Sequence, residues 1–117
     1  MLNLVLVISV SVTLRDAQHL CWKNFRKIND KLDPEKGKKW TPLMMVTEML
    51  EQTSKLANDA KNHDKDQVAE KSDAKAALAS ELSNLLYMIF VLAEHYGIEL
   101  EESFLQSVND QIISMLK

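Results

Sequence analysis

Apolar residues recur at helical spacing along four stretches of the chain, and each stretch predicts an α-helix. The first begins after Thr13, whose spacing to Asp16 fits a capping box, and runs to about Lys31. Its apolar positions at helical spacing are Leu14, Ala17, Cys21, Phe25 and Ile28. Residues 33–40 then hold a proline and a glycine among charged residues, which predicts a loop.

The second helix is predicted from Pro42 to about residue 62, with Thr41 as its N-cap. The charged stretch 62–73 is interpreted as a solvated connection of about ten residues, and Ser72 is the predicted N-cap of the third helix. Gly97 is expected to close that helix as its C′ residue. The fourth helix should run from about Leu100 to the end, with one apolar side of Phe104, Leu105, Val108, Ile112 and Met115.

The composition agrees with an all-α protein, because the 117 residues include only two glycines and two prolines. The length predicts one domain, which we place at residues 13–117. Residues 1–12 form an apolar, β-branched run that is too short to cross a bilayer, where about twenty residues are needed. We interpret this run as an N-terminal extension and expect no membrane association; a cleaved export signal is a minor alternative.

Charge and cysteine content narrow the classes of partner and compartment. The net charge is −3 and no stripe of lysine or arginine occurs, so nucleic-acid binding is not expected. Cys21 is the only cysteine, which excludes an intrachain disulfide framework and favours a reducing, cytoplasmic location. We expect its thiol to lie in the core.

The third predicted helix carries Glu81 and Asn84 inside an otherwise apolar run, on the side that must pack inward. An unpaired carboxylate in an apolar interior costs several kcal/mol or takes up a proton. Two explanations are open. Glu81 could form a buried ion pair with Arg15, Arg26 or a lysine, or it could be a metal ligand.

The second helix carries a polar stripe of Met44, Glu48, Glu51 and Lys55. On its own, this stripe could be a solvated face in which Glu51 and Lys55 form an ordinary i,i+4 pair. If the two helices pack together, however, Glu48, Glu51, Glu81 and Asn84 could converge on a hard cation. Oxygen ligands suit Mg²⁺, with Mn²⁺ as a substitute, and the histidines lack the ligand spacing typical of zinc.

The segments "LMMVTEMLEQTSKLAND" and "KAALASELSNLLYMIFVLAEHYGIELEESF" resemble the MazG-like all-α nucleotide pyrophosphohydrolases, in particular the small dCTP and dUTP pyrophosphatase type. The family pattern is Glu-x-x-Glu on one helix and Glu-x-x-Asp on the next, followed by an apolar run and a "GID/GIEL" turn. Here the pairs are Glu48 with Glu51 and Glu81 with Asn84, so an asparagine stands at the fourth acidic position. The resemblance covers residues 14–112.

The resemblance implies a four-helix bundle that assembles as a homodimer or homotetramer. It also implies Mg²⁺-dependent hydrolysis of a nucleoside triphosphate, such as dCTP, dUTP or a non-canonical nucleotide, to the monophosphate and pyrophosphate. Glu48, Glu51 and Glu81 would be catalytic residues and metal ligands together with Asn84. Trp40, Lys55 and Tyr87 are the candidate substrate-binding residues, and the two aromatic rings could stack on a base.

Two departures from the family define the alternatives. Asn84 removes one negative charge, and the last helix offers Ser107 and Gln111 but no arginine where the family holds the triphosphate with a lysine, an asparagine and arginines. Substitution by Asn109 or Lys117 would need a shift in register. The chain could therefore be a MazG-like nucleotide-binding or oligomeric module without turnover. A helical partner-binding module unrelated to nucleotides is a third possibility, and it predicts that Glu81 pairs with an arginine or lysine and that no acidic cluster forms.

Overall fold

The computed structural model describes residues 11–31, 40–65 and 68–116, and all regular structure in these ranges is helical. The elements are α2 (Leu14–Lys31), α3 (Pro42–Lys65), α4 (Val68–His95) and α5 (Leu100–Leu116). The predicted all-α class and the four helices are thereby confirmed. Most of the predicted extension, residues 1–12, lies outside the described residues, as does most of the predicted loop at 33–40.

The helix ends follow the predicted capping chemistry. The Asp16 backbone N–H donates to Thr13 Oγ1 over 3.1 Å, and the Met44 N–H donates to Thr41 Oγ1 over 3.2 Å. At the end of α4, Gly97 has φ of 69°, and the Ile98 N–H donates to the Ala93 carbonyl over 2.8 Å. This geometry is a Schellman motif, which turns the chain from α4 into α5.

The predicted connection at residues 62–73 is wrong. Helix α3 continues to Lys65 and α4 begins at Val68, so Ser72 lies inside a helix and is not an N-cap. The physical reason is that this stretch is polar but contains neither glycine nor proline, and residues such as Lys, Glu, Gln and Ala favour helix. The polar residues of this stretch therefore continue two helices and do not form a loop of about ten residues.

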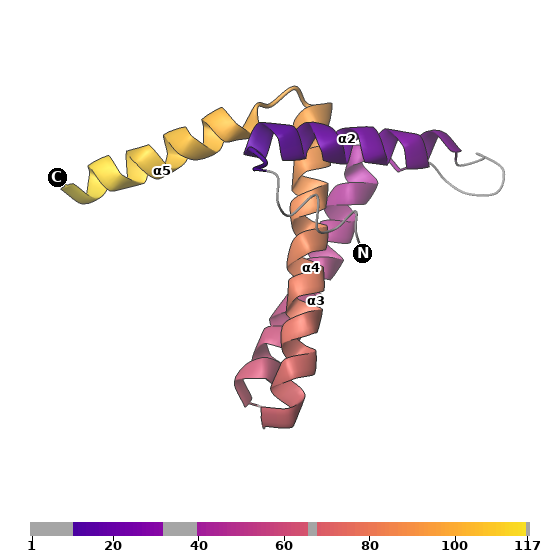
Figure 1. Cartoon of the computed structure of the whole chain (residues 1–117), viewed down its shortest axis with the longest axis vertical. Coiled ribbons are helices and arrows are strands. Elements are labelled where there is room, and N and C mark those ends of the chain that lie inside the picture. Colours follow the sequence, from indigo (N-terminus) through magenta and orange to yellow (C-terminus); the bar gives the residue numbers. More distant parts are fainter. Residues whose placement is uncertain (1–10, 32–39, 66–67, 117) are drawn as a thin grey trace.

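Helices α3 and α4 form a long antiparallel hairpin, and α2 crosses it near the open end (Figure 1). Met45, Met88 and Val91 are the centre of a small core at this crossing. Half-buried side chains of the three helices surround it: Cys21, Trp22, Phe25, Met49, Leu85, Tyr87 and Leu92. The expectation that Cys21 packs with the core is confirmed. Burial also raises the pKa of the Cys21 thiol, which keeps it protonated.

Helix α5 projects from the end of α4 away from the hairpin (Figure 1). None of its described residues is buried. The radius of gyration is accordingly 17.5 Å, whereas a compact domain of this length has about 13 Å. One stretch of α4, Asp73–His95, is long and apolar enough to cross a membrane by length and composition, a test that core helices of soluble proteins also pass.

Candidate functional site

A hollow of about 300 Å³ lies beside the core and is enclosed by α2, α3, α4 and Trp40. We call it the Trp40–Tyr87 hollow. Its apolar wall consists of Phe25, Ile28, Met45 and Met88, and its polar or aromatic residues are Asn29, Trp40, Glu48, Gln52, Asn84 and Tyr87. Four of the residues singled out from the sequence, Trp40, Glu48, Asn84 and Tyr87, therefore line one hollow.

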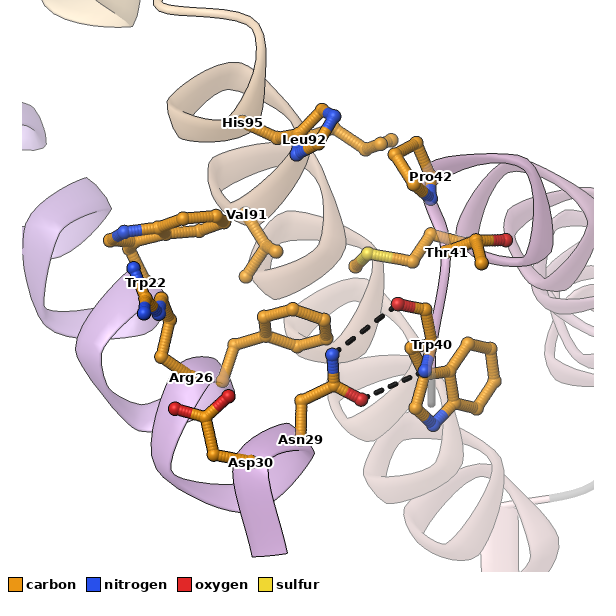
Figure 2. A pocket seen from close by; sticks show the side chains of 12 residues that line it. Trp22, Arg26, Asn29, Asp30, Trp40, Thr41, Pro42, Val91, Leu92 and His95 are labelled. Atoms are coloured by element: carbon orange, nitrogen blue, oxygen red, sulfur yellow. Dashed lines mark hydrogen bonds between the residues drawn. The ribbon is translucent and has the colours of Figure 1, made fainter. Parts of the chain in front are cut away.

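Trp40 is fixed through its backbone by a side chain of α2. The Trp40 N–H donates to Asn29 Oδ1 over 2.8 Å, and Asn29 Nδ2 donates to the Trp40 carbonyl over 3.4 Å (Figure 2). This pair ties the start of α3 to α2 across the segment between the two helices. The Trp40 side chain itself remains 38% exposed, so its ring is accessible from solvent.

A second hollow of about 280 Å³ adjoins the first and shares Phe25, Asn29, Trp40 and Met45 with it (Figure 2). Its wall also includes Trp22, which stacks on Phe25 with a centroid separation of 6.0 Å. The Arg26 guanidinium lies 5.9 Å from the Trp22 ring centroid, in cation–π range. Trp40 thus stands between two aromatic-lined spaces.

The polar groups of the Trp40–Tyr87 hollow are oriented by neighbouring side chains. Gln52 Nε2 donates to Glu48 Oε1 over 3.1 Å, one helical turn along α3. The Tyr87 hydroxyl donates to Asn24 Oδ1 over 2.7 Å. Burial, with a smaller contribution from Cys21, raises the pKa of the Tyr87 phenol. Tyr87 is therefore a neutral donor, and Glu48 keeps one carboxylate oxygen outside the Gln52 contact.

Glu81 lies apart from this hollow, beside the C-terminal half of α3. Its Oε2 is buried and has no hydrogen-bond partner within the described part of the chain. Burial first, and then the hydrogen bond and the charge of Asp59, raise the pKa of Glu81 above its ordinary 4.5, while the charge of Lys55 lowers it. Neither predicted arginine is its partner, because Arg15 binds Glu99 over 2.7 Å and Arg26 lies over Trp22.

The single chain does not gather the predicted metal ligands around one point. Glu51 is exposed, Glu48 and Asn84 line the Trp40–Tyr87 hollow, and Glu81 lies near Lys55 and Asp59. Across residues 11–31, 40–65 and 68–116, no group of three or more His, Cys, Asp or Glu side chains is close enough to hold a metal ion. A reason lies in helix geometry. Side chains lean toward the N-terminus of their helix, so Glu48 and Glu81 lean in opposite directions in an antiparallel hairpin.

Three residues with contacts that hold or charge the site region were not singled out from the sequence: Gln18, Asn29 and Asp59. Gln18 is 2% exposed and binds the turn between α4 and α5. Its position one turn after Leu14 places it on the apolar side of the first helix, a signal that periodicity offers. Asp59 likewise follows Glu48 and Lys55 at helical spacing. Nothing in the sequence pattern marks Asn29.

Comparison with protein-family models, with curated proteins and with solved structures finds no match for this chain.

Proposed function

We propose that the chain is a Mg²⁺-dependent nucleoside triphosphate pyrophosphohydrolase of the MazG-like type. The observation that supports this proposal most is the Trp40–Tyr87 hollow, which is lined by two aromatic residues together with the oxygen donors Glu48 and Asn84. Trp40 and Glu48 come from the region where α3 begins, and Asn84 and Tyr87 come from one side of α4, so the packing of the two helices brings the two pairs together. A space of about 300 Å³ is at the lower end of the range for small-molecule sites.

The aromatic residues suit a nucleobase. Trp40 offers an accessible ring whose backbone is held by Asn29, so stacking on it would cost little conformational entropy. Tyr87 and Asn24 supply a phenol and an amide that could recognise polar base edges. Lys55, which is exposed on α3, is the cation of the predicted site that could approach a phosphate.

The donor set fits a hard cation in its chemistry. Glu48, Glu51 and Glu81 supply carboxylates and Asn84 supplies an amide oxygen, which are the ligands Mg²⁺ prefers. The buried Glu81 Oε2 without a partner is an oxygen of the kind a cation would satisfy. In one chain Glu81 lies apart from Glu48 and Asn84, so these four residues would hold the ion as ligands from more than one copy, and the ion would neutralise phosphate charge during hydrolysis.

Residues of this chain would orient the attacking water and accept its proton. The Glu48 carboxylate, with Oε1 fixed by Gln52, is suited to orient the attacking water and to accept its proton. The apolar wall of Phe25, Met45 and Met88 excludes bulk water from one side of the hollow.

The proposal includes a homodimer or homotetramer, because one chain leaves much apolar surface exposed and gathers no complete ligand group in its described residues. The cytoplasmic location, based on the single cysteine, stays a prediction.

A second candidate is a nucleotide-binding or oligomeric module without turnover. It is favoured by Asn84 at the fourth acidic position and by the sequence of α5, LEESFLQSVNDQIISML, which contains no lysine or arginine. A partner-binding module unrelated to nucleotides agrees with the absence of a three-residue acidic cluster among the described residues, but a simple ion pair of Glu81 does not account for Asp59, which lies beside it as well as Lys55.

Pyrophosphate release from a panel of canonical and deoxynucleoside triphosphates, with Mg²⁺ or Mn²⁺, tests the proposal. We expect release that falls about 100-fold or more in Glu48→Gln, because a general base contributes at least that much. Glu102→Gln is the matched control, since Glu102 is an exposed carboxylate on α5 and should leave the rate unchanged.

Two other results would favour the second candidate. One is no release from any triphosphate by folded protein. The other is equal release by the wild type and Glu48→Gln, which would indicate a contaminating activity. In either case, Asn84→Asp tells whether the fourth ligand alone is missing, because restored release would show that the remaining site is intact.

A further inference from the structure

Two apolar faces of this chain have no cover within the described residues. The hairpin face lies on α3 and α4 and consists of the exposed side chains Leu43, Val46, Leu50, Leu82, Leu86 and Ile89. The arm face lies on α5 and consists of Phe104, Leu105, Val108, Ile112 and Met115. Leu43 is 76% and Met115 is 85% exposed. Exposed apolar surface this extensive is typical of an interaction site.

The hairpin face is made of one exposed apolar stripe on each of two adjacent helices. Leu43, Val46 and Leu50 share one side of α3, roughly opposite the core residue Met45. Leu82, Leu86 and Ile89 share one side of α4 in the same way. Because Met45 and Met88 meet in the core, the segments 43–50 and 82–89 lie at the same level of the antiparallel hairpin. The two stripes therefore lie at one level of the hairpin, and each is turned away from the core residues Met45 and Met88.

The arm cannot cover the hairpin face in its own chain, because contacts with α2 fix the direction in which α5 leaves α4. Gln18, which is 2% exposed, donates through Nε2 to the Ile98 carbonyl over 2.8 Å and accepts the Leu100 N–H at Oε1 over 3.2 Å. Arg15 Nε also binds Glu99 Oε2 over 2.7 Å. These contacts clamp the start of α5 to α2, and α5 points away from the hairpin (Figure 1).

We propose that the arm face of one copy packs on the hairpin face of a second copy, and that the second copy does the same in return, in a closed two-fold dimer. This contact deepens the proposal that the chain is an oligomer, but it needs neither nucleotide nor metal. Each copy offers one protruding helix and one uncovered two-helix surface, so a reciprocal exchange satisfies both faces at once. A one-way contact would leave one face open at each end and would propagate into a filament.

The size of the two faces fits a stable interface. Covering both faces in both copies buries on the order of 2,000 Å² in total, which is within the range of specific dimers. A helix laid on a helical hairpin also gives ordinary helix packing, with the arm stripe entering the groove between α3 and α4. The second copy is therefore a sufficient partner in both area and shape.

Site-specific cross-linking tests the exchange. In a Cys21→Ala background, one tagged chain carries Leu86→Cys and a second, differently tagged chain carries Val108→Cys. After mixing and equilibration, a short bis-maleimide should join the two different chains. Gln106→Cys replaces Val108→Cys in the matched control. Gln106 lies on the opposite side of α5, a helix diameter of about 10 Å away, so we expect roughly ten-fold less cross-link.

The supporting result also includes a solution mass of twice the 13.4 kDa of one chain by light scattering. Cross-linking of Val108→Cys chains only to one another would show that two arms pair, and it would overturn the exchange. A cross-link within a single Leu86→Cys/Val108→Cys chain at high dilution would show that the arm folds back, with the same consequence. A monomer that floats with phosphatidylcholine–phosphatidylglycerol vesicles would assign the apolar faces to a membrane. Since no pyrophosphate is measured, loss of the enzymatic proposal would leave this result unaffected.

Discussion

Glu94 and Glu81 are both half-buried glutamates of α4, but their surroundings differ. Glu94 Oε2 accepts a hydrogen bond from Gln18 Nε2 over 2.8 Å, and Glu94 Oε1 lies 3.1 Å from His19 Nδ1. Among the described residues, one buried oxygen of Glu81 has no hydrogen-bond partner, and a second carboxyl, that of Asp59, lies beside Glu81. Glu94 therefore has the contacts of a structural residue, whereas no described residue donates a hydrogen bond to the buried oxygen of Glu81.

The difference shows how a helix rich in apolar residues can carry two acids for separate reasons. At the end of α4, the half-buried Glu94 carboxylate accepts a hydrogen bond from Gln18, which also binds the turn into α5. In the middle of α4, an acceptor faces another acceptor, an arrangement that costs stability unless a proton or a cation intervenes. Unpartnered polar groups of this kind are typical of functional sites.

The largest expected effect is a loss of stability when the hydrogen bonds around Glu94 are removed. Gln18→Met keeps the side-chain volume but removes the bonds to Glu94, Ile98 and Leu100, which leaves partly buried polar groups unsatisfied. We expect a loss of about 3 kcal/mol in the free energy of unfolding, measured by urea denaturation. Gln106→Met is the control, because Gln106 is exposed and binds only Asp110 among described side chains. Equal losses in the two variants would show that the Gln18 clamp adds little.

A smaller loss of stability is expected from substitutions in the turn between α4 and α5. Gly97 has φ of 69°, and a Cβ at this position would meet no atom within 4 Å, so only the backbone preference opposes a side chain. Gly97→Ala should cost about 1 kcal/mol in thermal or chemical unfolding. Gly97→Asn should cost less, because asparagine tolerates the left-handed region. An alanine variant as stable as the wild type would contradict the Schellman geometry.

The smallest expected effect is a change in the pH dependence of stability when Glu81 is replaced. The pKa of Glu81 is raised in the folded chain, so the folded state keeps its proton at pH values where the unfolded state has already lost it. Its contribution to stability is therefore fully present below the ordinary pKa of 4.5 and is lost as the pH rises above that value toward the folded pKa. In metal-free buffer with EDTA, the melting temperature of the wild type should fall across this window more than that of Glu81→Gln. Glu102→Gln is the control and should keep the wild-type slope.

An opposite result is equally informative. If Glu81→Gln steepens the fall with pH, the charged form of Glu81 is stabilised in the folded chain, and Lys55 dominates over Asp59. The ion-pair interpretation of Glu81 would then replace the cation site.

Local signals in the sequence predicted much of the fold. The caps at Thr13 and Thr41 and the C′ glycine at position 97 were identified correctly, because capping depends on a few neighbouring residues. The connection between α3 and α4 was misplaced, because a charged stretch without glycine or proline can be a solvated helix as readily as a loop. Periodicity also identified the apolar side of α5 but could not tell whether it is covered within the chain.

The candidate site was predictable only in part. The sequence alone determined which residues can supply oxygen donors and aromatic rings, and periodicity determined which of them share a side of a helix. Only the tertiary structure decided that Glu48 and Asn84 join Trp40 and Tyr87, while Glu81 lies beside Asp59. The physical reason is that helix periodicity fixes the direction of a side chain around its own axis. The level at which two helices meet is fixed by long-range packing, here of Met45 on Met88.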